Sequence, residues 1–281
     1  MRSDFGPTTP LYKMQGSGND FILLDNRVSQ VPQEAMPTWA QNICRRAFGA
    51  GADGLILLDT APEGSEADYI WHFYNADGSR AEMCGNGSRC AARLAYELQL
   101  AGAKHVLGTD AGPVRAEVLP ATNEAKVQLT APLDLKTHIQ LTAADQELTV
   151  HHVNTGVPHL VLVVEDIEAV DLASIAPALR YHQAFAPAGA NVNFIQILGP
   201  ETIRLRTYER GVEDETYACG TGAAAAVYIA HHLGLSGPTA RVTTSGAETL
   251  TISQDNGNIY LQGQAVLVYH GQLMLQSVGI V

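Results

Sequence analysis

Hydrophobic and polar residues alternate over many short segments of this chain, which predicts a protein built mainly from β-strands. Turn-forming residues separate these segments, and few stretches have the 3.6-residue spacing of a helix. The expected fold class is therefore α+β with mostly antiparallel sheets. Strands are expected at 11–25 (two strands around a Gly-rich turn), 55–59, 67–74, 126–129, 147–153, 160–164, 191–198 and 201–208. Hairpins are expected at 106–118, 242–252 and 264–275, and helices at 37–48, at 172–179 with an interruption at Pro177, and directly after Cys84 and Cys219.

Residues 74–98 combine a polar turn, a cysteine, two glycines and a helix. The turn is Asn75 to Ser79, and Cys84 is followed at once by Gly85-Asn86-Gly87. Glycines let a ligand approach the backbone closely, and the first amides of a helix have no partners within it. This segment therefore predicts a small anion site with a thiol beside it.

The same arrangement occurs again at an offset of 135 residues, where Cys219 precedes Gly220-Thr221-Gly222. A strand leads in and a hairpin leads out in both places, so we expect one unit used twice. The predicted halves are 1–130 with 268–281, which carries Cys84, and 131–267, which carries Cys219. Residues that match at this offset are Gly85 and Gly220, Gly87 and Gly222, Ala91 and Ala226, Ala95 and Ala230, and Leu98 and Leu233.

Composition excludes several classes of protein. The net charge of −12 argues against nucleic acid and anionic membrane as partners. No apolar run reaches the roughly 18 residues that a membrane span needs. Residues 1–10 lack an apolar signal core, so we expect a short disordered lead and a cytoplasmic protein.

The remaining cysteines and the paired histidines do not predict a metal site. No Cys/His spacing fits structural zinc, and four cysteines in 281 residues do not make a disulfide framework. Cys44 and Cys90 lie in predicted helices and are expected to be buried small hydrophobes. His151 and His152 face opposite sides of a strand, and His231-His232 ends a helix, where the dipole favours imidazole. The glycines at 16–18 precede a strand instead of a helix, so they do not indicate a dinucleotide loop.

Two helix-capping thiols, one in each half, favour acid/base chemistry at carbon. If the halves face each other, one thiolate can remove an α-proton while the opposite thiol returns one to the other face. The amides around 85–87 and 220–222 would hold the substrate carboxylate and stabilise the charge that spreads onto it. A pyridoxal enzyme performs the same reaction, but no lysine lies in an evident phosphate-loop context, so a cofactor-independent mechanism is favoured.

Two other interpretations remain. The cysteines can simply fill space beside glycine turns, which would be preferred for one such motif but not for two matched ones. The chain can also be a thiol redox or ligand-binding protein whose cysteines form a disulfide. Resolving thiols are usually close in sequence, and these are not.

Several motifs in order resemble the diaminopimelate epimerase family: GSGNDF (16–21), FYNADGS (73–79), CGNGSRC (84–90), PH (158–159), NVNF (191–194), YERG (208–211) and ACGTGA (218–223). The resemblance implies two pseudo-symmetric domains, each a barrel-like sheet around a central helix. It implies conversion of LL-2,6-diaminopimelate to meso-diaminopimelate in lysine and peptidoglycan-precursor biosynthesis. It implies no cofactor and no metal, and a cytoplasmic homodimer.

The resemblance also assigns site residues. Cys84 and Cys219 would be the acid/base pair, supported by His159 and Glu209. The remaining substrate contacts would be Gly85, Asn86, Gly220 and Thr221 at the reacting end and Asn19, Asn75, Asn191, Glu209 and Arg210 at the distal end. Two positions depart from the family pattern: Gly54 stands for a Gln and Val157 for an Asn. A different amino-acid racemase with the same mechanism is the alternative.

Overall fold

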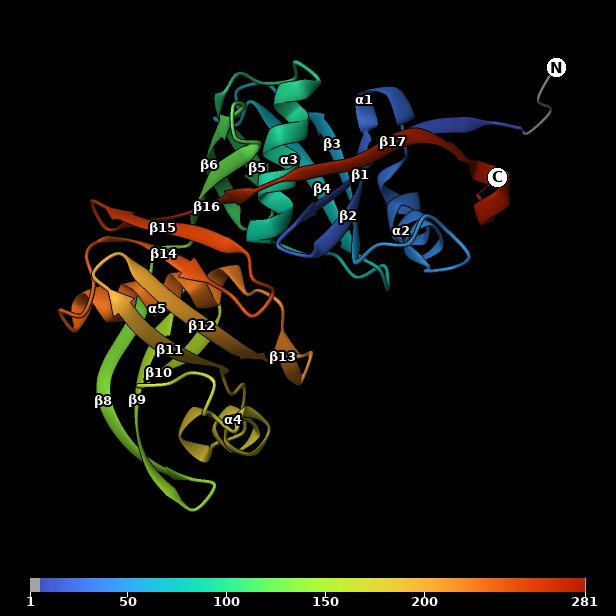
Figure 1. Cartoon of the computed structure of the whole chain (residues 1–281). Coiled ribbons are helices and arrows are strands. Elements are labelled where there is room, and N and C mark those ends of the chain that lie inside the picture. The colour runs from blue at the N-terminus through green and yellow to red at the C-terminus, as the bar shows by residue number, and fades with distance from the viewer. Residues whose placement is uncertain (1–5, 281) are drawn as a thin grey trace. The chain divides into compact units, whose positions relative to one another are not determined.

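The computed structural model describes residues 6–280 and contains two units, Met1–Val127 with Gln264–Val281, and Gln128–Gly263 (Figure 1). Of the expected disordered lead, residues 1–5 lie outside the described part. Thr8 to Pro10 belong to the first strand, so the prediction was wrong for these residues. No helix within residues 6–280 is long and apolar enough to cross a membrane.

The strands of the first unit pair in one continuous order. They are β17 (Val266–Met274), β1 (Thr8–Gly16), β2 (Asn19–Asp25), β3 (Gly54–Thr60), β4 (Tyr69–Asn75), β5 (Lys104–Thr109), β6 (Gly112–Leu119) and β7 (Glu124–Leu129). The β2–β3 and β4–β5 pairs are parallel and the others antiparallel. Each parallel pair is joined through a helix, because a parallel connection needs a long crossover.

The second unit repeats this order of pairings. Its strands are β8 (Leu133–Ala143), β9 (Gln146–Asn154), β10 (Pro158–Val163), β11 (Asn191–Gly199), β12 (Thr202–Glu209), β14 (Thr239–Thr243), β15 (Thr249–Asp255) and β16 (Asn258–Gln264). Here β10–β11 and β12–β14 are parallel, at the same two places in the series. The short β13 (Asp214–Thr216) also pairs with β12. The predicted α+β class with two similar halves is confirmed.

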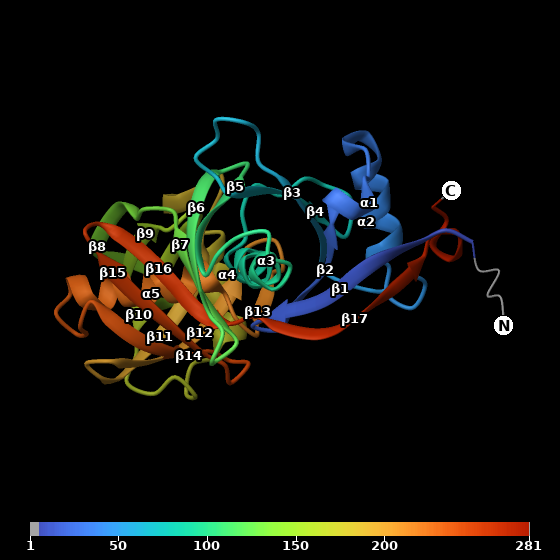
Figure 2. The same cartoon turned by 90° about the horizontal axis from the view of Figure 1, so that it is seen from above.

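One helix forms the centre of each unit. In the first unit α3 (Gly85–Glu97) contacts β1, β2, β3, β5 and β6, and Figure 2 shows it end-on among these strands. In the second unit α5 (Gly220–His232) contacts β9 to β12, β14 and β15. Both helices are buried along most of their length, and small residues such as Ala91 and Ala226 let the strands pack closely against them.

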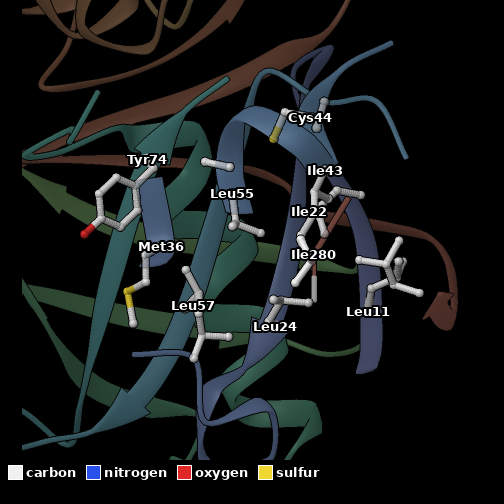
Figure 3. Packing of buried hydrophobic residues seen from close by; sticks show 14 residues of the cluster. Leu11, Ile22, Leu24, Met36, Ile43, Cys44, Leu55, Leu57, Tyr74 and Ile280 are labelled. Carbon is white, nitrogen blue, oxygen red and sulfur yellow. The ribbon is translucent and has the colours of Figure 1, made fainter. Parts of the chain in front are cut away.

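Two further helices cover the outer side of the sheets. In the first unit, α1 (Asn26–Ser29) and the 3₁₀ turn η1 (Gln33–Ala35) lead into α2 (Met36–Cys44), which packs on β2 and β3 through the cluster in Figure 3. Strands covered on both faces need uninterrupted apolar runs, which explains FILL in β2 and LILL in β3. In the second unit α4 (Leu172–Arg180) has a similar apolar cluster with the strands, and η2 (Gln183–Phe185) follows it. The 3₁₀ turn η3 (Leu275–Val278) is the last element of the described chain.

Several predicted elements were wrong in their bounds. The expected hairpin at 264–275 is one strand, β17, because residues 266–274 pair along the length of β1 and this pairing overrides the local turn signal at Gly271. The helix predicted at 37–48 ends at Cys44, because the amides of Gly51 and Ala52 cap the carbonyls of Ile43 and Cys44. Helix α4 continues through Pro177 without interruption.

Three strands were not predicted. Residues 133–143 (LDLKTHIQLTA) alternate between apolar and polar residues, so a signal for β8 was present in the sequence. The strand is largely exposed and carries positive φ angles at Asp134 and His138, where its register shifts. Strand β13 is only three residues long. Strand β16 follows the Asn256-Gly257 turn, whose positive φ angles are typical of a two-residue hairpin, so this signal was available in the sequence.

Candidate active site

The first half-site is built around Cys84, which caps the N-terminus of α3. The backbone N–H of Gly87 donates to Cys84 Sγ at 3.5 Å, and the thiol donates to Asn19 Oδ1 at 3.7 Å. An amide donor stabilises a thiolate, whereas an amide oxygen accepts only from the protonated thiol. Cys84 therefore has a partner for each protonation state.

Asn19 is held in one orientation by Asp53. Its Nδ2 donates to Asp53 Oδ2 at 2.7 Å, and Arg46 Nη2 donates to Asp53 Oδ1 at 2.9 Å. Because the Asn19 amino group is thereby fixed on the carboxylate, its Oδ1 is the atom that faces Cys84. The prediction included Asn19 but missed Asp53, and no local sequence signal places Asp53 beside Asn19.

Asn86 and Asn75 occupy different environments. Asn86 lies in the first turn of α3 and is only 8% exposed, and its Oδ1 has no hydrogen-bond partner among residues 6–280. Asn75 ends β4, where its Nδ2 donates to Ser79 Oγ at 3.0 Å and its side chain is exposed. The structure places Asn75 opposite Gly54 in the β3–β4 pairing.

The second half-site repeats the first around Cys219, which caps α5. The N–H of Gly222 donates to Cys219 Sγ at 3.4 Å, and Thr221 Oγ1 lies 3.5 Å from the same sulfur. His159 Nε2 lies 3.0 Å from Thr221 Oγ1, so the structure brings His159, Thr221 and Cys219 together. His159 is the second residue of β10, which begins two residues before the strand predicted at 160–164.

His159 is fully buried, and burial lowers its pKa to about 3. His152 and Arg210 lower this pKa further through their charges. A neutral imidazole carries one proton, so one of its ring nitrogens donates and the other accepts. Asn193 Nδ2 lies 3.0 Å from His159 Nδ1 and makes that nitrogen the acceptor.

Asn191, Glu209 and Arg210 meet at the ends of β11 and β12. Asn191 Oδ1 accepts from the Arg210 N–H at 2.7 Å, and its Nδ2 donates to the Pro158 carbonyl at 3.3 Å. The Asn191 amide thus holds the backbone of the turn in place. Glu209 Oε2 accepts from Thr216 Oγ1 at 2.9 Å, and burial raises the pKa of the Glu209 carboxyl.

Arg210 is half-buried and, within residues 6–280, has no acidic side chain at ion-pair distance. Glu209 and Arg210 are neighbours in sequence, but they do not form an ion pair with each other in this structure. A half-buried guanidinium without a carboxylate is a group that a carboxylate ligand can satisfy bidentately.

The two departures from the family pattern are structurally consistent. A Cβ on Gly54 would lie 2.7 Å from the Phe73 ring and 2.8 Å from the Tyr74 carbonyl, so no side chain fits without a shift. Val157 accepts from the Thr155 N–H through its carbonyl and offers no side-chain amide. Position 54 and position 157 therefore supply no polar side chain.

Two residues near the second half-site were not predicted. Asn193 and Thr207 are buried cross-strand neighbours on β11 and β12, and Thr207 Oγ1 donates to Asn193 Oδ1 at 2.9 Å. A signal was present, because Asn193 lies two residues after Asn191 and so on the same face of the strand.

Comparison with solved structures defines the class of fold. A probable proline racemase from Agrobacterium radiobacter superposes with a TM-score of 0.67 at 15% identity, covering 94% of this chain and 92% of that one. A hydroxyproline epimerase from Agrobacterium vitis gives 0.66 at 16% identity, covering 100% and 97%. The chain thus has the two-unit fold that these racemases and epimerases share.

Sequence comparison narrows the class to one family. The family model described as "Diaminopimelate epimerase" matches residues 11–133 and 151–268. The diaminopimelate epimerase of Aquifex aeolicus is 43% identical over 93% of this chain and 96% of its own length, and that of Methanocella arvoryzae is 39% identical over 93% and 95%. This chain belongs to the diaminopimelate epimerase family.

Proposed function

We propose that this protein epimerises LL-2,6-diaminopimelate to meso-diaminopimelate without a cofactor, using Cys84 and Cys219 as the acid/base pair. The observation that carries the proposal is the duplicated half-site. Each unit places a cysteine at the N-cap of its buried central helix, with a backbone N–H directed at the sulfur. A helix N-terminus lowers the pKa of a thiol, which makes a thiolate available near neutral pH. The mechanism requires both sulfurs to reach the same α-carbon, one from each face.

The helix N-termini supply the groups for the reacting end of the substrate. Gly85 and Asn86 in α3, and Gly220 and Thr221 in α5, lie in first turns, where the backbone N–H groups lack partners within the helix. These groups would bind the carboxylate and stabilise the charge that develops on it as the proton leaves. The buried Asn86 Oδ1 is an acceptor suited to the substrate ammonium.

Glu209 and Arg210 would recognise the distal, zwitterionic end of the substrate. Arg210 would bind the distal carboxylate and Glu209 would lie near an ammonium. Asn19 and Asn75 would contribute further polar contacts, and Asn191 would act mainly by holding the turn that presents Arg210. His159 and Glu209 would support the acid/base pair, since His159 reaches Cys219 through Thr221.

We further propose that the enzyme acts in lysine and peptidoglycan-precursor biosynthesis as a cytoplasmic homodimer that binds neither nucleic acid nor membranes. The net charge of −12 supports the exclusion of anionic partners.

The test is conversion of purified LL-diaminopimelate by the purified chain, followed by chiral chromatography, with no pyridoxal phosphate added. Alanine and proline serve as control substrates. The proposal expects an equilibrium mixture of LL- and meso-diaminopimelate and no turnover of either control. Turnover of alanine or proline, with diaminopimelate unchanged, would show a different racemase with the same fold.

A further inference from the structure

A buried polar network lies beneath the start of α5, and its hydrogens are determined by its geometry. Thr207 Oγ1 donates to Asn193 Oδ1, which identifies the oxygen of the Asn193 amide. The two hydrogens of Asn193 Nδ2 then go to the Leu160 carbonyl at 2.9 Å and to His159 Nδ1 at 3.0 Å. His159 Nδ1 is therefore the unprotonated nitrogen.

The orientation continues from His159 to the sulfur. With Nδ1 accepting, the single proton of the neutral imidazole sits on Nε2 and is donated to Thr221 Oγ1. Thr221 then has its own hydroxyl proton left, and Cys219 Sγ lies 3.5 Å from that oxygen. Each hydrogen bond in the series determines which atom donates in the next, so the Thr221 hydroxyl donates to Cys219.

The first unit shows that the fold does not require this network. The strand registers make His159, Asn193 and Thr207 in the second unit equivalent to Phe21, Ile56 and Phe73 in the first. The glycine three residues after each cysteine gives the same equivalence, because a Cβ on Gly222 would meet Asn193 Oδ1 and a Cβ on Gly87 would meet Ile56 Cδ1. In the first unit these positions are apolar, and Phe21 and Phe73 pack edge to face.

The two sulfurs consequently have different neighbours. Both accept from a helix N–H, but Cys84 also faces an acceptor, Asn19 Oδ1, whereas Cys219 also faces a donor, the Thr221 hydroxyl. An acceptor favours the protonated thiol and a donor favours the thiolate.

We propose that Asn193 and Thr207 are positioning residues that hold His159 in the Nε2–H tautomer. In this tautomer the Thr221 hydroxyl donates to Cys219, so Cys219 is the resting thiolate and Cys84 is the resting thiol. This proposal deepens the proposed function and rests on it for its catalytic meaning. The titratable and charged groups that act on His159 are His152 on β9 and Arg210 after β12. Substitution of Thr207 leaves both in place, so their contributions are common to every variant compared.

The test compares Thr207→Val with Thr207→Ser. Valine has nearly the same shape without the hydroxyl, whereas serine keeps the donor. Without that donor Asn193 Oδ1 has no partner, and the amide can turn its oxygen to His159, which moves the imidazole proton to Nδ1. The Thr221 hydroxyl would then donate to His159 Nε2 and no longer to Cys219.

The readout is alkylation of each cysteine by iodoacetamide across pH 5–9, followed by peptide mass spectrometry, which needs no turnover. In the wild type we expect Cys219 to react with a lower pH midpoint than Cys84. In Thr207→Val the pH midpoint for alkylation of Cys219 should rise by up to about one pH unit. At pH values below the midpoint, the alkylation rate of Cys219 should then fall by up to about tenfold. Cys84 in the same sample should not change, and Thr207→Ser should keep the wild-type rate within about twofold.

Equal changes at both cysteines, or an unchanged Cys219 in a folded Thr207→Val protein, would overturn the proposal.

A second measurement uses the wild type alone, in case the valine variant does not fold. Nitrogen-15 NMR of histidine-labelled protein, with the His159 signals assigned through His159→Gln, reports the tautomer directly. The Nε2–H form between pH 6 and 8 is expected, and the Nδ1–H form contradicts the proposal. Failure of diaminopimelate turnover would instead count against the proposed function.

Discussion

The matched glycines Gly87 and Gly222 allow a direct test of the difference between the two half-sites. Each is the third residue of its helix, and each backbone N–H donates to the capping cysteine. Replacement by alanine leaves that N–H in place and improves helix propensity by about 1 kcal/mol. What differs between the two is the neighbour that the new methyl group would meet.

In Gly222→Ala the new Cβ would lie 2.5 Å from Asn193 Oδ1 and 3.3 Å from Cys219 Sγ. Asn193 is fully buried and uses its amide in hydrogen bonds with His159, Leu160 and Thr207. Moving this amide leaves two buried polar groups unsatisfied, at a cost of about 1–3 kcal/mol each. After subtracting the gain of about 1 kcal/mol in helix propensity, we expect a loss of about 1–5 kcal/mol, or about 2–20 °C in Tm.

In Gly87→Ala the nearest atom is Ile56 Cδ1 at 3.2 Å, the end of a flexible side chain, with Trp71 at 3.5 Å. Overpacking here should be offset by the gain in propensity, so we expect a stability within about 1 kcal/mol of the wild type. The assay is thermal and urea unfolding of both variants beside the wild type. Equal destabilisation of the two variants, or a Gly222→Ala protein as stable as the wild type, would refute the argument from Asn193.

Three other predictions follow from the site. Cys84→Ala and Cys219→Ala should each reduce kcat for epimerisation at least about 10²–10⁴-fold, because a proton must be moved on both faces of the carbon. The control variants Cys44→Ala and Cys90→Ala should remain active. Near-normal turnover by Cys84→Ala would exclude the two-thiol mechanism. Arg210→Lys should fold normally but lower kcat/KM for diaminopimelate at least about tenfold, because an ammonium cannot replace a bidentate guanidinium; unchanged kinetics would remove Arg210 from the distal site. The pKa of His159 is lowered to about 3, so the unfolded chain takes up this proton first as the pH falls below about 6.5. The free energy of unfolding should therefore fall with decreasing pH over this range by up to ~1.4 kcal/mol per pH unit more steeply than in His159→Gln, and identical slopes would show that His159 is protonated in the folded state.

The sequence was most informative where a local motif carries the structure. Cys84 and Cys219 before glycines and helical runs predicted both capped central helices, and their constant offset predicted the duplicated fold. Hydrophobic alternation located most strands. The same alternation is present at 133–143, so β8 was predictable although much of it is exposed. The turn expected at Gly271 was wrong because β17 pairs along β1, from the opposite end of the chain, and this long-range pairing outweighs the local signal.

The site was predictable as a set of residues but not as a set of contacts. Asp53 orients Asn19 across 34 positions of sequence, and Asn193 and Thr207 orient His159 across strands. Such partners depend on strand register, which a single sequence does not specify. Glu209 shows the converse, since its carboxylate accepts from Thr216 and does not pair with Arg210, its neighbour in sequence.

The most direct test of the central claim, that two thiols serve opposite faces of one carbon, is epimerisation in heavy water followed only to low conversion. Each thiol would deliver a proton that comes from solvent, so the first product formed should carry deuterium at the inverted α-carbon. The unreacted LL-diaminopimelate recovered from the same sample should still carry protium. Product that retains the original proton, or substrate that exchanges as fast as product forms, would contradict the two-base mechanism and require one group to act on both faces.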